Sequence, residues 1–502
     1  MTNRTSGIRS LLRSPISRVI GRSIFALAIG ASLFLVPKQA SAQAWLRDRR
    51  YLEGEGLRGG DFEFHPGIGG EIGYDSNWFL RSNKTDPRFV NGAPQNPPTD
   101  GAILRITPSL SLNTVRPKDP TAAPSPIGFT AAVAATYREF FGKQELRDQR
   151  NLSGNAVARL DINNGRPVAF GIFASYQRLI QPAVVADPNL SFNRSDVGAG
   201  ADVTVLPGGG TLDMKFGYQF FGALFEESNG APFTSYTHEL SVRNRWRFRP
   251  RTALFSETTL RFQHYPNADR AINYLNDSTP LRTRFGVTGL LTNRFGVLLA
   301  AGYGATFFQK PEQVSTKQYD SVNAQAEGTF YLSQGAGADE PGKATLLLST
   351  ITFGYSRDFQ TSLLSNYYTS NKGYAKVVYM FGNKVLMSLD GYGEAQSYPQ
   401  PFYNRAGGPP VPAKGANGQP TGDFTNYRIG ALLFLEYKLS SAFGINATFD
   451  YSQTISDVAL DVGGGAAGAA GAAGAAGAPA APQLYDLSWS RFQALLGARY
   501  FF

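Results

Sequence analysis

The sequence contains no cysteine and only three histidines among its 502 residues. Without cysteine, neither a disulfide framework nor a thiolate metal site can form. His65, His238 and His264 are scattered along the chain, and no His-x-x-x-His pair, nucleophile elbow or Walker loop accompanies them. We therefore expect no enzyme activity, no bound metal and no cofactor.

Long apolar runs are also missing after residue 42, where none approaches the roughly 20 residues that a membrane-spanning helix needs. The mean hydropathy of −0.22 is too polar for a helical membrane protein. Glycine (55 residues) and aromatic residues (13%) are abundant instead. A chain of this composition without a helical pattern favours an all-β architecture.

The first 42 residues have the pattern of a secretory signal peptide. Five arginines from Arg4 to Arg22 precede an apolar run from Ser23 to Val36, and small residues follow at 40–42. The run is too short to span a bilayer, so we expect cleavage after Ala42 rather than a retained anchor. Six of the 48 basic residues lie in this leader, and the others exceed the 38 acidic residues by only four. A nucleic-acid partner is therefore not expected.

The body of the chain alternates with a period of two residues. In TLDMKFGYQFF, which begins at Thr211, large apolar residues alternate with Asp, Lys, Gly and Gln. Such alternation places one row of side chains on each side of a sheet. A soluble β-sandwich would show the same pattern, so the connections between the strands must distinguish the two folds.

These connections alternate in length. Tight turns rich in Gly, Pro and Asn, such as NNGRP and LPGGG, alternate with long segments such as 75–100 and 398–422. Outer-membrane barrels have this form, with short periplasmic turns and long external loops. We predict an all-β fold, a transmembrane antiparallel up-and-down β-barrel of about 18 strands. It should occupy 61–502, from a strand near Phe62 to one near Tyr485, after a short periplasmic segment at 43–60. Two turns, at 116–126 and 333–342, are longer than this scheme expects.

The chain ends on bare aromatic residues, in LLGARYFF. Every second residue from Phe492 to Phe502 is apolar, and the alternate row carries Arg491 and Arg499. If Phe502 faces lipid, the whole apolar row does, and the last strand closes the barrel against the first. The ending, with Tyr500 and Phe502, resembles the signal that bacterial outer-membrane proteins present to their assembly machinery. This machinery and outer-membrane lipid are therefore expected partners.

An 18-strand barrel is wide enough for an aqueous channel, so its inward rows should carry the function. Three neighbouring strands place a basic track on the predicted inner face: Arg243, Arg245, Arg247, Arg261, Arg282 and Arg284. Other strands place acidic residues inward: Glu327, Asp390, Glu394 and Asp450. A cluster of arginines favours anions. Alternatively, the charges of a polar lumen simply pair with one another.

Six aromatic residues share the predicted inward parity: Phe173, Phe221, Phe308, Tyr331, Tyr392 and Phe434. Their faces could stack on sugar rings, or they could pack against loops folded into the pore. Outward aromatic residues such as Tyr74, Trp246 and Tyr437 fit the girdles at the membrane interfaces. The stretch 463–482, in which glycine recurs every third residue from Gly465 to Gly477, should form a flexible external loop.

The segment HPGIGGEIGYDSNWFLRS, His65 to Ser82, resembles the opening strand of the β-barrel porins encoded beside exopolysaccharide biosynthesis genes. In that family a glycine-rich first strand ends in a Tyr-Asp-[Asp/Ser]-Asn turn, which here is Tyr74 to Asn77. The resemblance covers under a twentieth of the chain. It implies export of a polysaccharide handed over by a periplasmic polysaccharide export protein, as in the myxobacterial polysaccharide-secretion barrels.

Two functions are therefore open from the sequence. One is a conduit for exopolysaccharide across the outer membrane. The other is a diffusion porin for small solutes, anionic ones included. A barrel that mainly presents its loops to surface partners is a third alternative.

Overall fold

The structure, a computed structural model, describes residues 56–114, 125–180, 193–226, 231–267, 276–309, 318–332, 349–362, 365–382, 384–399, 402–404, 410–412, 414–415, 422–461 and 484–502. The predicted signal peptide at 1–42, residues 43–55, most of the long turn at 116–126, the turn at 333–342 and the glycine-rich stretch at 463–482 lie outside these residues.

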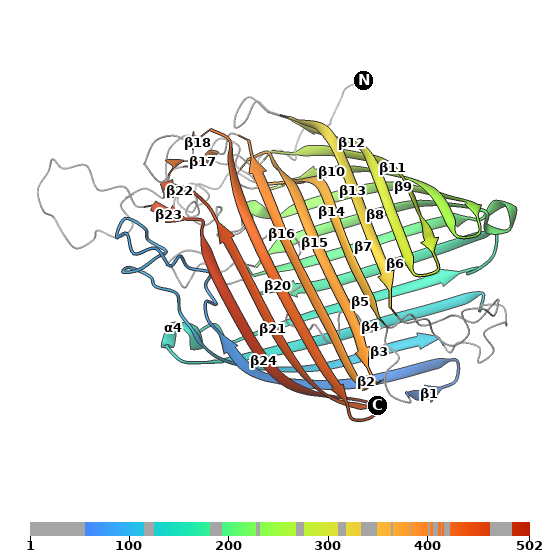
Figure 1. Ribbon diagram of the computed structural model, residues 1–502, viewed down its shortest axis with the longest axis horizontal. Helices are drawn as coiled ribbons and strands as arrows, with labels where there is room; N and C mark the ends of the chain where they lie inside the picture. Colours follow the sequence, from blue (N-terminus) through green and yellow to red (C-terminus); the bar gives the residue numbers. More distant parts are fainter. Residues whose placement is uncertain are drawn as a thin grey trace, which may run out of the picture.

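Eighteen long strands form one antiparallel sheet (Figure 1). They are β2 (Phe62–Asp75), β3 (Gly101–Thr114), β4 (Ile127–Phe141), β5 (Asn151–Ile162), β6 (Val168–Leu179), β7 (Arg194–Val205), β8 (Leu212–Phe225), β9 (Ser235–Arg249), β10 (Thr252–His264), β11 (Ser278–Thr292), β12 (Phe295–Phe308), β13 (Tyr319–Tyr331), β14 (Thr350–Thr361), β15 (Tyr367–Phe381), β16 (Val385–Tyr398), β20 (Phe424–Lys438), β21 (Phe443–Ile455) and β24 (Trp489–Phe501). A short strand, β1 (Leu57–Gly59), extends the sheet by pairing with the start of β2.

The sheet closes on itself because the last long strand pairs with the first. β24 runs antiparallel to β2 from the pair Gly67↔Phe501 to the pair Asp75↔Gln493. Just beyond, the backbone N–H of Phe502 donates to the carbonyl of Pro66 at 2.9 Å. Closure leaves no sheet edge with unpaired N–H and C=O groups, which is the condition for crossing a bilayer. The predicted closed barrel of 18 antiparallel strands is thus confirmed.

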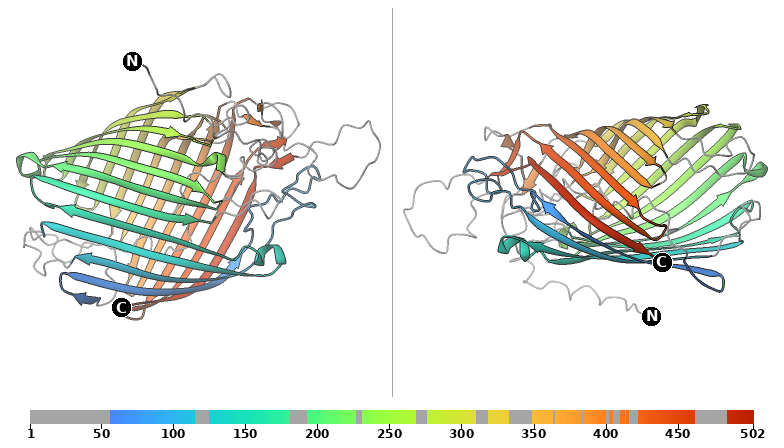
Figure 2. Two further views of the ribbon diagram at one scale, coloured as in Figure 1. Left: turned by 180° about the vertical axis from the view of Figure 1, so that it is seen from behind. Right: turned by 60° about the horizontal axis from the view of Figure 1, so that its bottom comes forward.

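The two rims of the barrel differ (Figure 2). One carries tight turns, among them residues 250–251 between β9 and β10, and the C-terminal end of β24. In the turn after β7, Gly208, Gly209 and Gly210 have φ values of 64° to 88°, which other residue types adopt only with strain. Because short turns belong to the periplasmic side of such barrels, we assign this rim to the periplasm.

The opposite rim carries most of the longer connections and most of the short elements, although the connections from β3 to β4 and from β13 to β14, which contain the two turns that the sequence marked as long, belong to the tight-turn rim. The short elements on the opposite rim are α4 (Gln144–Arg147), η3 (Ala231–Phe233), β17 (Phe402–Asn404), β18 (Pro410–Pro412), β19 (Lys414–Gly415), β22 (Val458–Asp461) and β23 (Leu484–Asp486). The sequence placed the start of the last barrel strand near Tyr485. This residue instead belongs to β23, which pairs with β22, and the barrel strand begins at Trp489.

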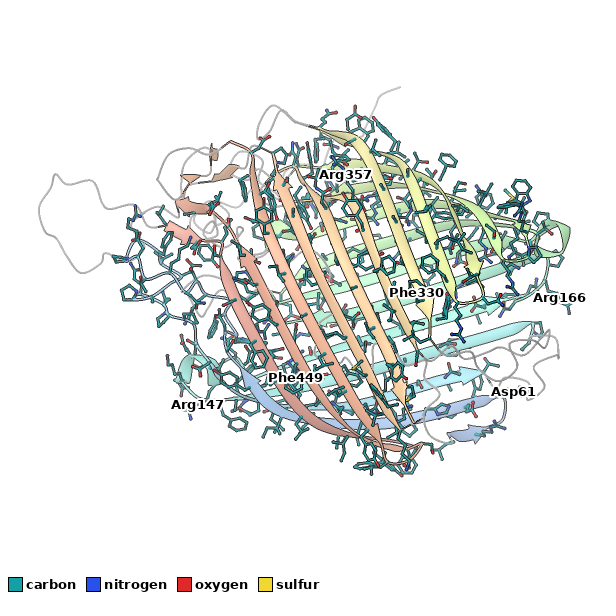
Figure 3. The ribbon with its side chains drawn as sticks, in the orientation of Figure 1. Asp61, Arg147, Arg166, Phe330, Arg357 and Phe449 are labelled. Atoms are coloured by element: carbon teal, nitrogen blue, oxygen red, sulfur yellow. The ribbon has the colours of Figure 1, made fainter. Side chains whose placement is uncertain are left out.

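The outer wall is apolar, and the rows that alternate with it are polar. Phe330 and Phe449, labelled in Figure 3, are exposed on this outer wall. The predicted girdle residues Tyr74, Trp246 and Tyr437 are exposed as well. Lipid outside and water inside favour this division of side chains. Among the described residues, no helix is both long and apolar enough to span a bilayer.

Changing Phe502 to Asp should impair assembly of the barrel. Phe502 is 55% exposed on the outer row, and its ring contacts that of Tyr500, with centroids 5.1 Å apart. A charge near the membrane interface costs a formed barrel only about 0–1 kcal/mol. The loss should therefore occur at insertion, where the aromatic ending is recognised. Heat-modifiable gel migration measures the folded fraction, with Phe502→Tyr as the matched control. An undiminished folded fraction for Phe502→Asp would contradict this role.

Candidate functional site: the wall of the lumen

The register of the barrel decides which side chains face the lumen. Directly opposed residues of antiparallel strands lie on the same face of the sheet. The exposed residues Leu240, Leu254 and Phe285 mark the outer rows of β9, β10 and β11. Five of the six candidate arginines lie on the alternate, inner rows of these strands. Arg247 lies beyond a register shift, beside the turn, and is exposed.

Glu257 joins two arginines of the basic track. It lies directly opposite Arg243 on β9 and opposite Arg284 on β11. Its carboxylate lies 2.6 Å from Nη2 of Arg284 and 3.8 Å from Nη1 of Arg243. Nη1 of Arg284 also donates to Oε1 of Gln325 on β13 at 3.0 Å. One carboxylate therefore serves two guanidinium groups, and this part of the wall keeps a net positive charge.

Two further arginines of the track are ion-paired. Arg261 lies directly opposite Glu239 and donates to its carboxylate. Arg282 reaches across β12 and β13 to Asp358 on β14, at 3.0 Å, and its guanidinium lies 4.2 Å from the ring centroid of Phe359. Each of these pairs removes one free charge from the lumen.

Arg245 and Arg247 differ from the other four. Arg245 is half-buried and Arg247 is exposed at the periplasmic end of β9. Among the described residues, neither has a carboxylate within ion-pair distance. Asp213 of β8 lies directly opposite Arg245 without forming an ion pair. The six arginines thus face four carboxylates and form ion pairs with three of them, so the charge of the track is only partly neutralised.

The four candidate acidic residues lie on the inner rows of β13, β16 and β21. Glu327 accepts a hydrogen bond from the hydroxyl of Tyr374 at 2.6 Å, and Glu394 accepts one from Ser370 at 2.6 Å. Asp390 lies 3.8 Å from the ammonium of Lys376, and Asp450 lies opposite Gln493 of β24. The part of the chain that the structure describes has no group of three His, Cys, Asp or Glu side chains that could hold a metal ion.

A buried polar network beside the barrel seam escaped the sequence analysis. Asp75, at the end of β2, accepts hydrogen bonds from Arg491 and Gln493 of β24, and from the backbone N–H of Asn77. The side-chain amide of Asn77 donates to the carbonyls of Arg81 and Ser490. The Tyr-Asp-Ser-Asn turn therefore ties the first external connection to both strands of the seam. Its one sequence signal was the pair of side chains, Asp and Asn, that commonly bond to nearby backbone.

The connection from β2 to β3 also packs on the inner wall. Trp78 and Phe79 form a buried cluster with Ile103 of β3, Phe140 of β4, Leu146 of α4 and Leu495 of β24. The ring centroids of Trp78 and Phe140 lie 4.6 Å apart. Ile103, Phe140 and Leu495 belong to the inner rows, so this connection covers part of the lumen wall near the outer rim.

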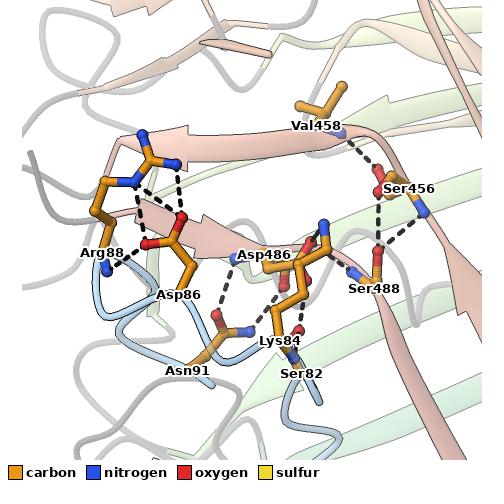
Figure 4. A network of polar contacts seen from close by, with 9 residues as sticks. All are labelled: Ser82, Lys84, Asp86, Arg88, Asn91, Ser456, Val458, Asp486 and Ser488. Carbon is orange, nitrogen blue, oxygen red and sulfur yellow. Dashed lines mark hydrogen bonds and ion pairs between the residues drawn. The ribbon is translucent and has the colours of Figure 1, made fainter. Parts of the chain in front are cut away.

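Asp486 of β23 holds the next part of the same connection (Figure 4). Its fully buried carboxylate accepts from the hydroxyl of Ser82 and from the ammonium of Lys84, the latter at 3.0 Å. Its backbone exchanges two hydrogen bonds with the side chain of Asn91. Nearby, hydrogen bonds from the side chain and backbone of Arg88 lower the pKa of Asp86 to about 2.

The inward aromatic residues fall into two groups. Phe308 and Phe434 are buried, at 6% and 4% exposure. Phe308 packs with Tyr319 and Phe359, so it is part of the wall and not a free surface. Phe221 on β8 is 37% exposed on the inner row, so its ring meets the water of the lumen.

The closed sheet, its apolar exterior and its polar interior define a transmembrane β-barrel of the bacterial outer membrane, with the fold of porins and transporters. No family model matches the sequence, and no curated protein matches it.

Three solved structures with a similar fold are distant from this chain in sequence. One is OccAB4 of Acinetobacter baumannii, at 10% identity and TM-score 0.40, covering 90% of this chain and 100% of that one. A second is the siderophore receptor PirA of Pseudomonas aeruginosa, at 7% identity and TM-score 0.40, covering 88% and 80%. A third is the FrpB iron transporter of Neisseria meningitidis, at 9% identity and TM-score 0.42, covering 92% and 83%.

Replacing Asp486 with Asn should loosen the connection from β2 to β3 while the barrel stays folded. The change keeps the shape of the side chain but removes the charge that Lys84 faces, and a charge-assisted hydrogen bond contributes about 1.5–3 kcal/mol. Trypsin added to intact cells should then cleave after Lys84 or Arg88 several times faster. Asp148→Asn, at the exposed end of α4, is the control. An unchanged cleavage rate would show that Asp486 does not hold the connection.

Proposed function

We propose that this barrel is the conduit through which an exopolysaccharide crosses the outer membrane. The observation that carries the proposal is the chemistry of the lumen wall. Several of its charges are paired, as Glu257 with Arg284 and Glu239 with Arg261 illustrate. Between them lie hydroxyl, amide and aromatic side chains. Such a wall offers many weak partners to the hydroxyl groups of a sugar chain.

Weak contacts suit a moving polymer. An exposed ion pair typically contributes about 0–1 kcal/mol, and a hydrogen bond that replaces one to water contributes about 0.5–1.5 kcal/mol. A polymer that exchanges such contacts one at a time meets no deep free-energy minimum along the lumen, so it can slide. The resemblance of His65 to Ser82 to exopolysaccharide-associated porins supports the same reading.

A periplasmic partner would hand the polymer to the tight-turn rim, as the resemblance implies for a polysaccharide export protein. Arg249, Arg251 and Arg294 are exposed on this rim, in or beside neighbouring turns. Exposed cations at the entrance would attract an acidic partner surface or an acidic polymer.

A diffusion porin is the second candidate, and the excess of arginine favours it. The six arginines of the basic track face four carboxylates, so this part of the wall keeps a net positive charge, which would attract small anions. The two functions differ in what the cell loses when the barrel is absent.

Deletion of the gene should abolish surface polysaccharide and leave uptake of small solutes nearly unchanged, because a conduit is specific for its polymer. Surface polysaccharide is measured on whole cells by a sugar-specific stain, and solute uptake by radiolabelled sugars and phosphate. Plasmid-borne wild-type protein should restore the polymer. Normal surface polymer with slowed uptake would overturn the export proposal and favour the porin.

A variant with Arg243, Arg245, Arg282 and Arg284 changed to Ser separates the arginine track from the conduit. It leaves Glu257 and Asp358 without these partners, so bilayer recordings should lose any anion preference while the barrel folds. An acidic polymer would then reach the surface in smaller amounts. A normal amount of surface polymer in this variant would show that the arginines are not needed for export, and would not contradict the conduit itself.

A further inference from the structure

Two tyrosines lie flat on the inner wall halfway along the barrel. Tyr374 on β15 and Tyr392 on β16 are directly opposite one another. Tyr374 has Gly354 of β14 as its other neighbour, and Tyr392 has Gly430 of β20. These four strands are adjacent in the front wall of Figure 1. The row therefore reads glycine, tyrosine, tyrosine, glycine across four strands.

The glycines allow the rings to lie down. A Cβ atom on Gly354 would collide with the ring of Tyr374, and one on Gly430 would collide with the ring of Tyr392. Each ring thus covers a glycine of the neighbouring strand with one face, a contact that stabilises glycine in sheets. Both tyrosines are half-buried. Because both residues lie on inner rows, their partly exposed rings form part of the lumen wall.

Each ring is also held by a charged group. The hydroxyl of Tyr374 donates to Glu327 of β13 at 2.6 Å, which fixes the ring tip. The ammonium of Lys372 lies 4.7 Å from the ring centroid of Tyr392, a cation–π contact that a ligand can displace at a half-exposed site. The rings are therefore oriented before any ligand arrives, which lowers the entropy cost of binding.

Charged side chains flank the two rings along the barrel axis. On the outer-rim side, Lys372 lies directly opposite Glu394. On the periplasmic side, Lys376 lies opposite Asp390, with 3.8 Å between ammonium and carboxylate. Donors and acceptors for hydroxyl groups thus stand on both sides of two aromatic faces.

We propose that Tyr374 and Tyr392 form a saccharide-binding platform on which pyranose rings of the passing polymer stack. The C–H faces of sugars pack on the electron-rich faces of aromatic rings, and the flanking Lys and carboxylate groups bond the hydroxyl groups around each ring. This proposal rests on the proposed function and names neutral pyranose units as the ligand of the platform.

The opposite wall has the same arrangement of aromatic rings over glycines. Phe173 on β6 lies over its cross-strand partner Gly200, and Phe255 on β10 lies over its partner Gly286. Both rings are half-buried on inner rows. A sugar chain in the lumen would therefore meet flat aromatic faces from more than one side.

The platform is tested on the purified barrel with two defined probes, maltohexaose and cellohexaose. In planar bilayers each sugar should block the ion current transiently. Changing Tyr374 and Tyr392 together to Leu should shorten the blocks about tenfold, the effect of losing two ordinary stacking contacts. Tyr374→Phe with Tyr392→Phe should retain the blocks, because the ring faces remain. Tyr427→Leu, on the lipid-facing row of β20, is the matched control and should match the wild type.

Saturation-transfer NMR on the detergent-solubilised barrel gives a second measure that needs no open channel. It should show transfer to both sugars in the wild type and a weaker signal in the double Leu variant. Unchanged binding in that variant, or no binding of either sugar by the wild type in both measurements, would overturn the platform. Neither result bears on the proposed function, which fails instead if the deletion strain keeps its surface polysaccharide.

Discussion

The backbone hydrogen bonds between β2 and β24 are the contact on which the rest of the structure depends. In a bilayer, every N–H and C=O group of a strand must find a partner within the protein, because lipid offers none. The other long strands pair with neighbours in chain order, and only this pairing joins the two ends of the sheet. Closure fixes the register of the seam, and the register fixes which rows face lipid and which face water. The last strand therefore carries an apolar row that ends at Phe502 and a polar row that includes Arg491.

Inside the barrel, the same closure produces a wall of matched polar groups. Ionised side chains on inner rows sit opposite one another at fixed spacing, so Glu257 serves both Arg243 and Arg284. Glycine on one strand lets a tyrosine of the next lie flat, as Gly354 does for Tyr374. The lumen thus presents ion pairs, an excess of arginine and aromatic faces on the same wall. The Tyr-Asp-Ser-Asn turn, at the end of β2, begins the connection to β3, which covers part of the lumen wall. Hydrogen bonds join this turn to both strands of the seam.

Much of this could be predicted from the sequence, because alternation reports the two faces of a strand without any knowledge of its neighbours. The inward parity of Arg282 and the outward parity of Tyr437 both followed from it. What escaped prediction depends on register or on distant contacts. Two examples are the ion pairs of Glu257 with both Arg243 and Arg284, and the packing of the Tyr392 ring over Gly430. Predicting them requires the exact cross-strand residue pairs. The hydrogen bonds that Ser82 and Lys84 donate to Asp486 join segments about 400 residues apart, and no local sequence pattern predicts them. The sequence places the start of the last barrel strand near Tyr485, but this residue lies in the short strand β23, and the barrel strand begins four residues later at Trp489.

Disulfide formation across the seam tests the central claim most directly, since the chain has no native cysteine. Ile72 and Leu496 are register partners on the outer row of β2 and β24. Opposed Cα atoms in antiparallel strands lie about 4.5–5.5 Å apart, within the range for a disulfide. The Ile72→Cys, Leu496→Cys chain should therefore form a disulfide in the outer membrane. After unfolding without reductant, the crosslinked chain should migrate faster on a gel than the reduced chain. The shifted pair, Ile72→Cys with Ala494→Cys, should crosslink poorly. Crosslinking of the shifted pair alone, or of neither pair, would contradict a barrel closed in this register.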